Sequence, residues 1–156
     1  MCLTQTHSIV LQPEILLRKK APIIITPHPG EMSRLTGLAT PLVNAERERV
    51  ALDFAQKYGV VTVLKGAGTV IASPNGKALV NPTGNSGMAT GGSGDVLAGM
   101  TASILAQGAS AFSSAAAAVY LHGLAGDIAA EKYGKISMLP TDLINCIPLA
   151  YKRCGF

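Results

Sequence analysis

Charged residues are scarce in this chain. Of its 156 residues, 14% are charged and 4% aromatic, and none is tryptophan, whereas globular domains average about 25% charged residues. The net charge of +4 comes mostly from small Lys and Arg excesses near the two ends, and no basic stripe runs between them. A nucleic-acid-binding protein is therefore not indicated. With 48% apolar residues, the chain has enough apolar area to fold, which excludes a disordered protein.

Cysteine is scarce too, and its pattern argues against two kinds of site. Cys2, Cys146 and Cys154 are odd in number and have no C-x-x-C spacing, so neither a disulfide framework nor a zinc site is indicated. We expect free thiols in a reducing cytoplasm. Residues 1–5 contain no apolar signal-peptide core.

The absence of charge over residues 96–121 raises the possibility of a transmembrane helix. This run consists of Ala, Gly and Ser more than of Leu, Ile and Phe, and a Gln-Gly-Ala-Ser sequence divides it at residues 107–110. We therefore favour two helices packed in a protein core over a membrane span, and we expect no membrane partner.

The order of apolar runs and turn residues predicts an α/β fold. Continuous apolar runs at 23–26 and 60–64 are typical of strands buried on both faces. An Asn-Gly pair at 75–76 predicts a hairpin after them. Helices are predicted over residues 31–38, 45–58, 95–107, 110–132 and 140–153. This order indicates a layered fold whose sheet is at least partly parallel, with ligands bound at the carboxyl ends of the strands.

A glycine-rich loop precedes the helix predicted from residue 95. Over residues 66–126 the only charged side chains are Lys77 and Asp95, and Asp95 directly follows the sequence G-G-S-G. Glycines and a helix N-terminus together favour a phosphate or a transferring phosphoryl group. Asp95 could accept the proton of an attacking hydroxyl group. The alternative is that Asp95 only caps the helix and the glycines form a turn.

Two better-known nucleotide motifs are absent. The Walker A pattern does not occur, and the third glycine of a dinucleotide fingerprint would fall on Leu97. The loop is therefore neither a P-loop nor the first turn of a Rossmann unit.

Two further loops follow the predicted strands. The sequence K-G-A-G-T at 65–69 could line a nucleotide pocket, although a solvent-facing Lys65 at a strand end is the ordinary interpretation. His28 and Glu31 lie in a proline-flanked turn. His28 taken alone is more typical of a loop histidine than of a catalytic group. Glu31 is interpreted as a helix-start acid, with contact to magnesium through water as the minority interpretation.

Helical positions near the C-terminus are interpreted structurally. His122 has no partner nearby in the sequence, so it is interpreted as a core or interhelix histidine. Asp127 and Glu131, four residues apart on the same helix, are interpreted as part of a solvated face.

Three motifs together resemble one family. T-P-H-P-G-E at 26–31, K-G-A-G-T at 65–69 and N-P-T-G-N-S-G-M-A-T-G-G-S-G-D-V-L-A-G at 81–99 occur in its order and approximate spacing. They resemble the ADP/ATP-dependent NAD(P)H-hydrate dehydratases of the ribokinase-like superfamily. The resemblance implies a layered α/β/α fold and a repair reaction, in which a nucleotide phosphorylates the hydroxyl of hydrated NADH or NADPH and phosphate is then eliminated.

The resemblance also implies roles for single residues. Asp95 would be the base on the hydrate hydroxyl, and His28 would contact the hydrated substrate. The anion hole would be formed by Gly92, Ser93 and Gly94. The nucleotide would be held by Lys65, Gly66, Ala67, Gly68, Thr69, Asn85 and Gly94. ADP or ATP would be the co-substrate with Mg²⁺, which Glu31 would contact through water, and we expect a homo-oligomer.

The resemblance runs from about residue 16 to about 149 and covers the C-terminal part of the family's domain. We therefore expect residues 1–156 to form one truncated domain without the family's N-terminal strands, with an exposed edge strand near 23–26. Two alternatives stay open: a ribokinase-like kinase of a small alcohol, and a non-catalytic nucleotide-binding fragment. T-P-H-P-G-E favours the dehydratase over the kinase.

Overall fold

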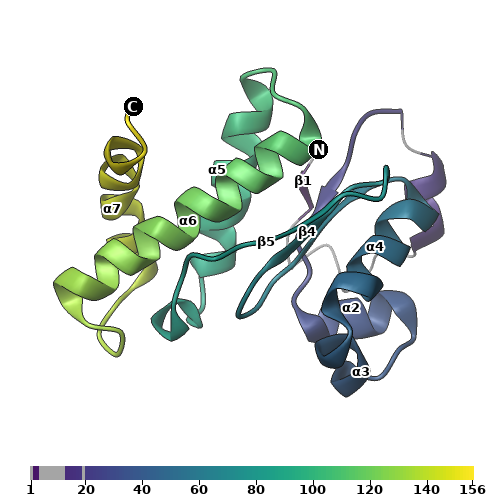
Figure 1. Ribbon diagram of the computed structural model, residues 1–156, viewed down its shortest axis with the longest axis horizontal. Coiled ribbons are helices and arrows are strands. Elements are labelled where there is room, and N and C mark those ends of the chain that lie inside the picture. The colour runs from purple at the N-terminus through teal and green to yellow at the C-terminus, as the bar shows by residue number, and fades with distance from the viewer. Residues whose placement is uncertain (1, 4–12, 19) are drawn as a thin grey trace.

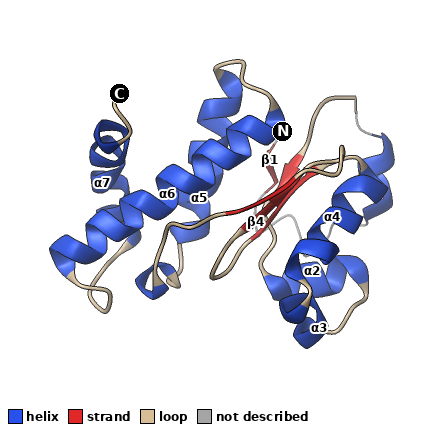
Figure 2. Ribbon diagram, viewed as in Figure 1, coloured by secondary structure: helices blue, strands red, loops and turns tan. Residues whose placement is uncertain are grey.

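The chain folds into three layers, with one sheet between two groups of helices (Figures 1 and 2). The computed structural model describes residues 2–3, 13–18 and 20–156. Within them the sheet has five strands in the order β1-β2-β3-β4-β5. The strands are β1 (Cys2–Leu3), β2 (Ile24–Ile25), β3 (Val61–Leu64), β4 (Val70–Ala72) and β5 (Ala78–Val80). The layered α/β prediction is confirmed.

The first three strands are parallel, and β4 and β5 continue the sheet as an antiparallel hairpin. Because β2 and β3 run in the same direction, the loops after them leave from one edge of the sheet. The prediction that residues 23–26 form an exposed edge strand is wrong, since β2 pairs with β1 on one side and with β3 on the other.

Helices cover both faces of the sheet. The 3-10 helix η1 (Pro13–Arg18), α2 (Pro29–Thr36), α3 (Thr40–Ala45) and α4 (Arg47–Tyr58) lie on one face. The other face carries α5 (Ser93–Ala106), α6 (Ala111–Tyr133) and α7 (Pro140–Arg153), preceded by the short 3-10 helix η2 (Ser86–Met88). The helix predicted over 45–58 is observed as α4, whereas α3 was not predicted, and Glu46, at φ −124° and ψ 41°, separates the two helices.

The central strand β3 shows why its residues form an unbroken apolar run. Val61 and Val63 pack into the cluster beneath α5, α6 and α7, whereas Leu64 belongs to the cluster beneath α2 and α4. All four residues of β3 are buried. A strand with helices on both faces needs apolar side chains in both directions, as the sequence predicted.

The uncharged run of residues 96–121 forms parts of α5 and α6, which pack against each other. Gly108, at φ 92°, lies in the turn between them. This confirms the prediction of two packed helices. Within the described residues no helix combines the length and the hydropathy that crossing a bilayer requires.

The glycine-rich segment after β5 lies directly on α6 because α6 carries glycines where the two touch. A Cβ on Gly123 would lie 2.8 Å from the carbonyl carbon of Thr83. Gly126 similarly leaves room for the Met88 side chain, since a Cβ there would lie 2.8 Å from Met88 Cγ. The missing side chains therefore let residues 81–92 approach the helix.

We predict that Gly123→Ala lowers the free energy of unfolding by about 1–3 kcal/mol, because the added methyl group overpacks against the Thr83 backbone. Gly99→Ala is the matched control, since it is also a helical glycine and its Cβ would meet no atom within 4 Å outside its own helix. That control should raise the free energy by about 0.5–1 kcal/mol. Urea unfolding measures both, and equal effects would contradict the packing described here.

Candidate functional site

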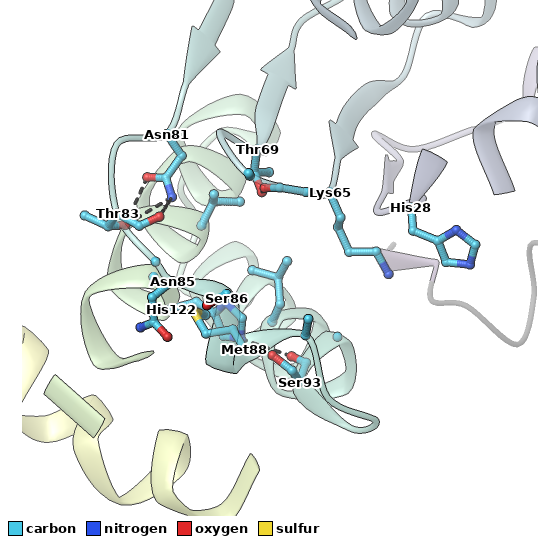
Figure 3. Close-up of a pocket in the computed structure, with 18 of the residues that line it drawn as sticks. His28, Lys65, Thr69, Asn81, Thr83, Asn85, Ser86, Met88, Ser93 and His122 are labelled. Atoms are coloured by element: carbon cyan, nitrogen blue, oxygen red, sulfur yellow. Dashed lines mark hydrogen bonds between the residues drawn. The ribbon is translucent and has the colours of Figure 1, made fainter. Parts of the chain in front are cut away.

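A cavity of about 930 Å³ opens at the carboxyl ends of β2 and β3. Three segments far apart in the sequence line it, together with the adjoining face of α6 (Figure 3). They are the turn at 28–29, the loop at 65–69 and the glycine-rich segment at 81–94. The three motifs singled out in the sequence therefore meet in one place.

The turn before α2 is held rigid by its own hydrogen bonds. The Nδ1 atom of His28 accepts from the N–H groups of Gly30 and Glu31 at 3.1 and 3.2 Å. The carboxylate of Glu31 accepts from the His28 N–H at 2.7 Å, which completes a capping box. The turn touches the next loop directly, because the Lys65 N–H donates to the Pro27 carbonyl at 2.8 Å.

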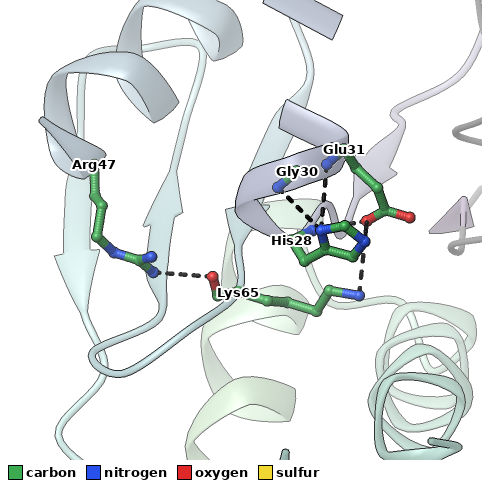
Figure 4. Close-up of polar contacts among 5 residues, drawn as sticks. All are labelled: His28, Gly30, Glu31, Arg47 and Lys65. Carbon is green, nitrogen blue, oxygen red and sulfur yellow. Dashed lines mark hydrogen bonds and ion pairs between the residues drawn. The ribbon is translucent and has the colours of Figure 1, made fainter. Parts of the chain in front are cut away.

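Lys65 places a positive charge inside the cavity. Its Nζ lies 3.9 Å from Oε2 of Glu31, whose carboxylate is fully buried (Figure 4). Burial lowers the pKa of the Lys65 ammonium, while the Glu31 and Asp95 carboxylates act to raise it. A Cβ on Gly94 would lie 3.3 Å from Nζ. The ammonium group therefore lies against both the T-P-H-P-G-E turn and the start of α5.

The N-terminus of α5 forms the opposite wall of the cavity. Gly92 caps the helix at φ 95°, a left-handed conformation that favours glycine. The Ser93 N–H donates to Thr90 at 3.3 Å and the Asp95 N–H to Gly92 at 3.0 Å. Among the described residues, no acceptor takes the Gly94 N–H. A first helical turn with an unused amide beside an ammonium group suits an anion.

Asp95 lies in the first turn of α5, at the border between the cavity and solvent. Its side chain is exposed, and it is outside the set of residues that line the cavity. Its carboxylate is nevertheless close enough to act on the charge of Lys65. An exposed acid beside a helix N-terminus is accessible to a group that approaches from solvent.

Asn85 lines the cavity but uses both hydrogens of its amide within the protein. Its Nδ2 donates to the carbonyl of Gly126 at 3.0 Å and to Oδ1 of Asp127 at 2.9 Å. Its Oδ1 accepts from the Gly87 N–H at 3.0 Å. The side chain therefore anchors its loop to α6, and only Oδ1 has capacity left for a ligand.

Asp127 is the partner in this anchor, and the interpretation of it as part of a solvated face is wrong. Its Oδ2 also accepts from the Gly84 N–H at 2.9 Å. Glu131, by contrast, lies on an exposed surface, where it pairs with Arg153 at 2.9 Å. Sequence spacing could not separate the two acids, since the partners of Asp127 lie more than 40 residues away.

His122 supports the same wall from α6. The ring is buried, and its Nε2 lies 3.0 Å from the Ser93 carbonyl. Burial, assisted by the nearby charge of Lys65, lowers the pKa of His122 to about 4, although the bond to the Ser93 carbonyl acts to raise it. Because a carbonyl can only accept, we assign the hydrogen to Nε2. Sequence spacing identified a buried histidine but not its partner at the start of α5.

We predict that His122 makes the fold acid-sensitive. The folded chain binds this proton less tightly than the unfolded chain, whose reference pKa is 6.5, so unfolding takes up a proton as the pH falls below 6.5. Between pH ~7.5 and pH ~5 the free energy of unfolding should drop by about 2 kcal/mol on account of His122. In His122→Gln this part of the drop should disappear, as urea unfolding at both pH values would show. An unchanged drop would contradict the assigned burial.

Comparison with known proteins gives one consistent result. Residues 6–149 match the family described as NAD(P)H-hydrate dehydratase. The chain is 43% identical over 147 residues to a bifunctional NAD(P)H-hydrate repair enzyme of Moorella thermoacetica, covering 94% of this chain and 28% of that protein. The match begins nearer the N-terminus than the predicted residue 16.

Solved structures agree with this match. An ADP/ATP-dependent NAD(P)H-hydrate dehydratase from Bacillus subtilis, co-crystallized with ATP/Mg²⁺, superposes with a TM-score of 0.82 at 38% identity, over 85% of this chain and 48% of that one. A ribokinase-like superfamily protein of Enterococcus faecalis gives a TM-score of 0.73 at 36% identity, over 86% and 46%. The chain thus has a ribokinase-like fold and spans about half the length of these two proteins.

Proposed function

This chain belongs to the NAD(P)H-hydrate dehydratase family, and from that we propose that its cavity binds ADP or ATP and that Asp95 takes part in dehydrating hydrated NADH or NADPH. One observation carries the proposal. The loop at 65–69 and the N-terminus of α5 face one cavity with the Lys65 ammonium between them, and Asp95 follows directly at the border. This arrangement would fit the phosphate chain of a nucleotide inside the cavity, with the hydroxyl group of the substrate beside Asp95 at the end of that chain.

Phosphate binding would be shared between the two walls. Lys65, Gly66, Ala67, Gly68 and Thr69 would hold the nucleotide on one side. On the other, Gly92, Ser93 and Gly94 would form the anion hole around the transferring phosphoryl group. Backbone N–H groups fixed in place before the reaction stabilise the charge that develops on a phosphoryl group without having to reorient. His28, at the cavity edge, would contact the hydrated ring.

The reaction would proceed in two balanced steps. Asp95 would accept the proton of the ring hydroxyl group while the hydroxyl oxygen attacks the terminal phosphorus of the nucleotide. The bond between that phosphorus and the rest of the nucleotide then breaks. The carbon–oxygen bond of the phosphorylated ring then breaks, with phosphate taking the electron pair. The adjacent ring carbon then loses a proton to water, which restores the double bond of the reduced nicotinamide.

Magnesium would be held largely by the nucleotide itself. No group of three or more His, Cys, Asp or Glu side chains in the described part of the chain could bind a metal ion. Magnesium in nucleotide sites is commonly bound through one or two carboxylates, water and phosphates. Oε1 of Glu31 is buried and accepts no hydrogen bond from any described residue, which supports contact through a metal-bound water. Bound magnesium would neutralise phosphate charge.

We predict that Asp95→Asn lowers the rate of NADH recovery from hydrated NADH by about 10²–10⁴-fold, because the amide cannot accept the hydroxyl proton. The rise in absorbance of reduced nicotinamide with ADP or ATP and Mg²⁺ measures the rate. Nucleotide affinity, measured by calorimetry, should stay within about threefold, since phosphate binding is assigned to other groups. Asp53→Asn is the matched control, because it makes the same change at an exposed position of α4. An unchanged rate in Asp95→Asn would refute the assigned base.

The same experiment separates the two alternatives. Nucleotide consumption with a small alcohol, without recovery of NADH, would favour a kinase. Nucleotide binding without either reaction would favour a non-catalytic fragment. The match of residues 6–149, which includes the T-P-H-P-G-E turn, favours the dehydratase.

The surroundings of the reaction are also proposed. Cys146 and Cys154 carry free thiols, which supports a reducing compartment, and we propose the cytoplasm. A homo-oligomer stays a prediction.

A further inference from the structure

We propose that Arg47, the first residue of α4, is a positioning residue that turns the peptide groups of the loop at 65–69 toward bound phosphate. The inference rests on the proposed function, because it assigns that loop to the nucleotide. Arg47 lies outside the three motifs, in an Arg- and Glu-rich stretch of ordinary appearance.

The guanidinium group of Arg47 binds the loop from the side opposite the cavity. Its Nη2 donates to the carbonyl of Lys65 at 3.1 Å, the contact drawn in Figure 4. It also donates to the carbonyls of Leu64 at 2.9 Å and Gly68 at 3.5 Å. The Lys65 side chain extends the other way, toward Glu31. One cation on the α4 side thus contacts the last carbonyl of β3 and two carbonyls of the loop at 65–69.

The geometry of the peptide group determines where the N–H groups of this loop point when its carbonyls bind Arg47. In a planar trans peptide the C=O and the N–H point in opposite directions. The carbonyls of Lys65 and Gly68 are directed toward Arg47, so the N–H groups of Gly66 and Thr69 are directed away from it. Within the described chain neither N–H donates to a protein acceptor. Converging backbone N–H groups are a recurring way of binding anions.

The fit of Arg47 also explains why residue 66 is glycine. Gly66 has φ 141°, and a Cβ there would lie 2.6 Å from Nη1 of Arg47. A side chain at position 66 would therefore displace the guanidinium group from behind the loop. Arg47 is half-buried, and its Nε has no partner among the described residues. Its planar, rigid fork can hold several carbonyls at once, which the single ammonium of lysine does less well.

Arg47→Met tests the inference, because methionine keeps an unbranched apolar stem and removes the donors. We expect the affinity of the chain for ADP in the presence of Mg²⁺ to fall about 10–100-fold, and the affinity for adenosine, which has no phosphate, to stay unchanged. Arg47→Lys should recover part of the loss. Arg49→Met is the matched control, since it removes the same charge from an exposed position of α4 paired with Glu46 and Asp53. It should leave ADP affinity within about twofold. Titration calorimetry measures these affinities for the wild type and the three variants.

A second measurement distinguishes failure of the role assigned to Arg47 from failure of the proposed function. Backbone order parameters at 66–69, measured by NMR without nucleotide, should be lower in Arg47→Met than in wild type, because the carbonyls of the loop lose their fixed partner, whereas a matching thermal unfolding temperature would show that the fold is kept. Unchanged order parameters, or equal loss of ADP and adenosine binding, would overturn the inference. A wild-type chain that binds neither ADP nor ATP would overturn the proposed function, and with it the role of Arg47 in phosphate binding.

Discussion

The parallel pairing of β2 with β3 is the constraint on which the site depends. The hydrogen bond from the Lys65 N–H to the Pro27 carbonyl extends this pairing past the strands, into the loops themselves. It brings a capped helix start and a lysine-bearing loop into contact, so the buried Glu31 carboxylate faces the Lys65 ammonium. Without this register the motifs would be unrelated loops on one edge of a sheet.

The walls of the cavity are supported from outside it. Arg47 contacts the loop at 65–69 from α4, His122 contacts the first turn of α5, and Asp127 fixes the segment around Asn85. Each supporting group satisfies backbone carbonyls or amides that would otherwise lack partners away from water. The cavity wall between residues 66 and 94 can therefore consist of glycines and uncharged side chains, which agrees with the low charge of this part of the chain.

The sequence predicted what depends on local pattern. Buried strands, the hairpin, the paired helices and the glycine loops follow from hydropathy and turn chemistry, and the motifs identified the family. The short helix α3 was missed because its six residues contain one proline and bury only Val43, too little for a helical pattern. The interpretation of His122 as a buried interhelix histidine is confirmed, but its partner Ser93 was missed and Asp127 was misinterpreted, because Ser93 and Asn85 lie 29 and 42 residues away from them. Such contacts depend on tertiary packing, which no local pattern records.

The glycines of α6 have a consequence for the thermodynamics of ligand binding. Gly123 and Gly126 let the segment at 81–92 lie directly against the helix, and Asp127 and His122 hold it near its two ends. A wall ordered in advance does not lose loop entropy when a ligand arrives. The cavity therefore has its shape before any ligand binds, and the exposed Asp95 lies outside the part of the wall that is held in this way.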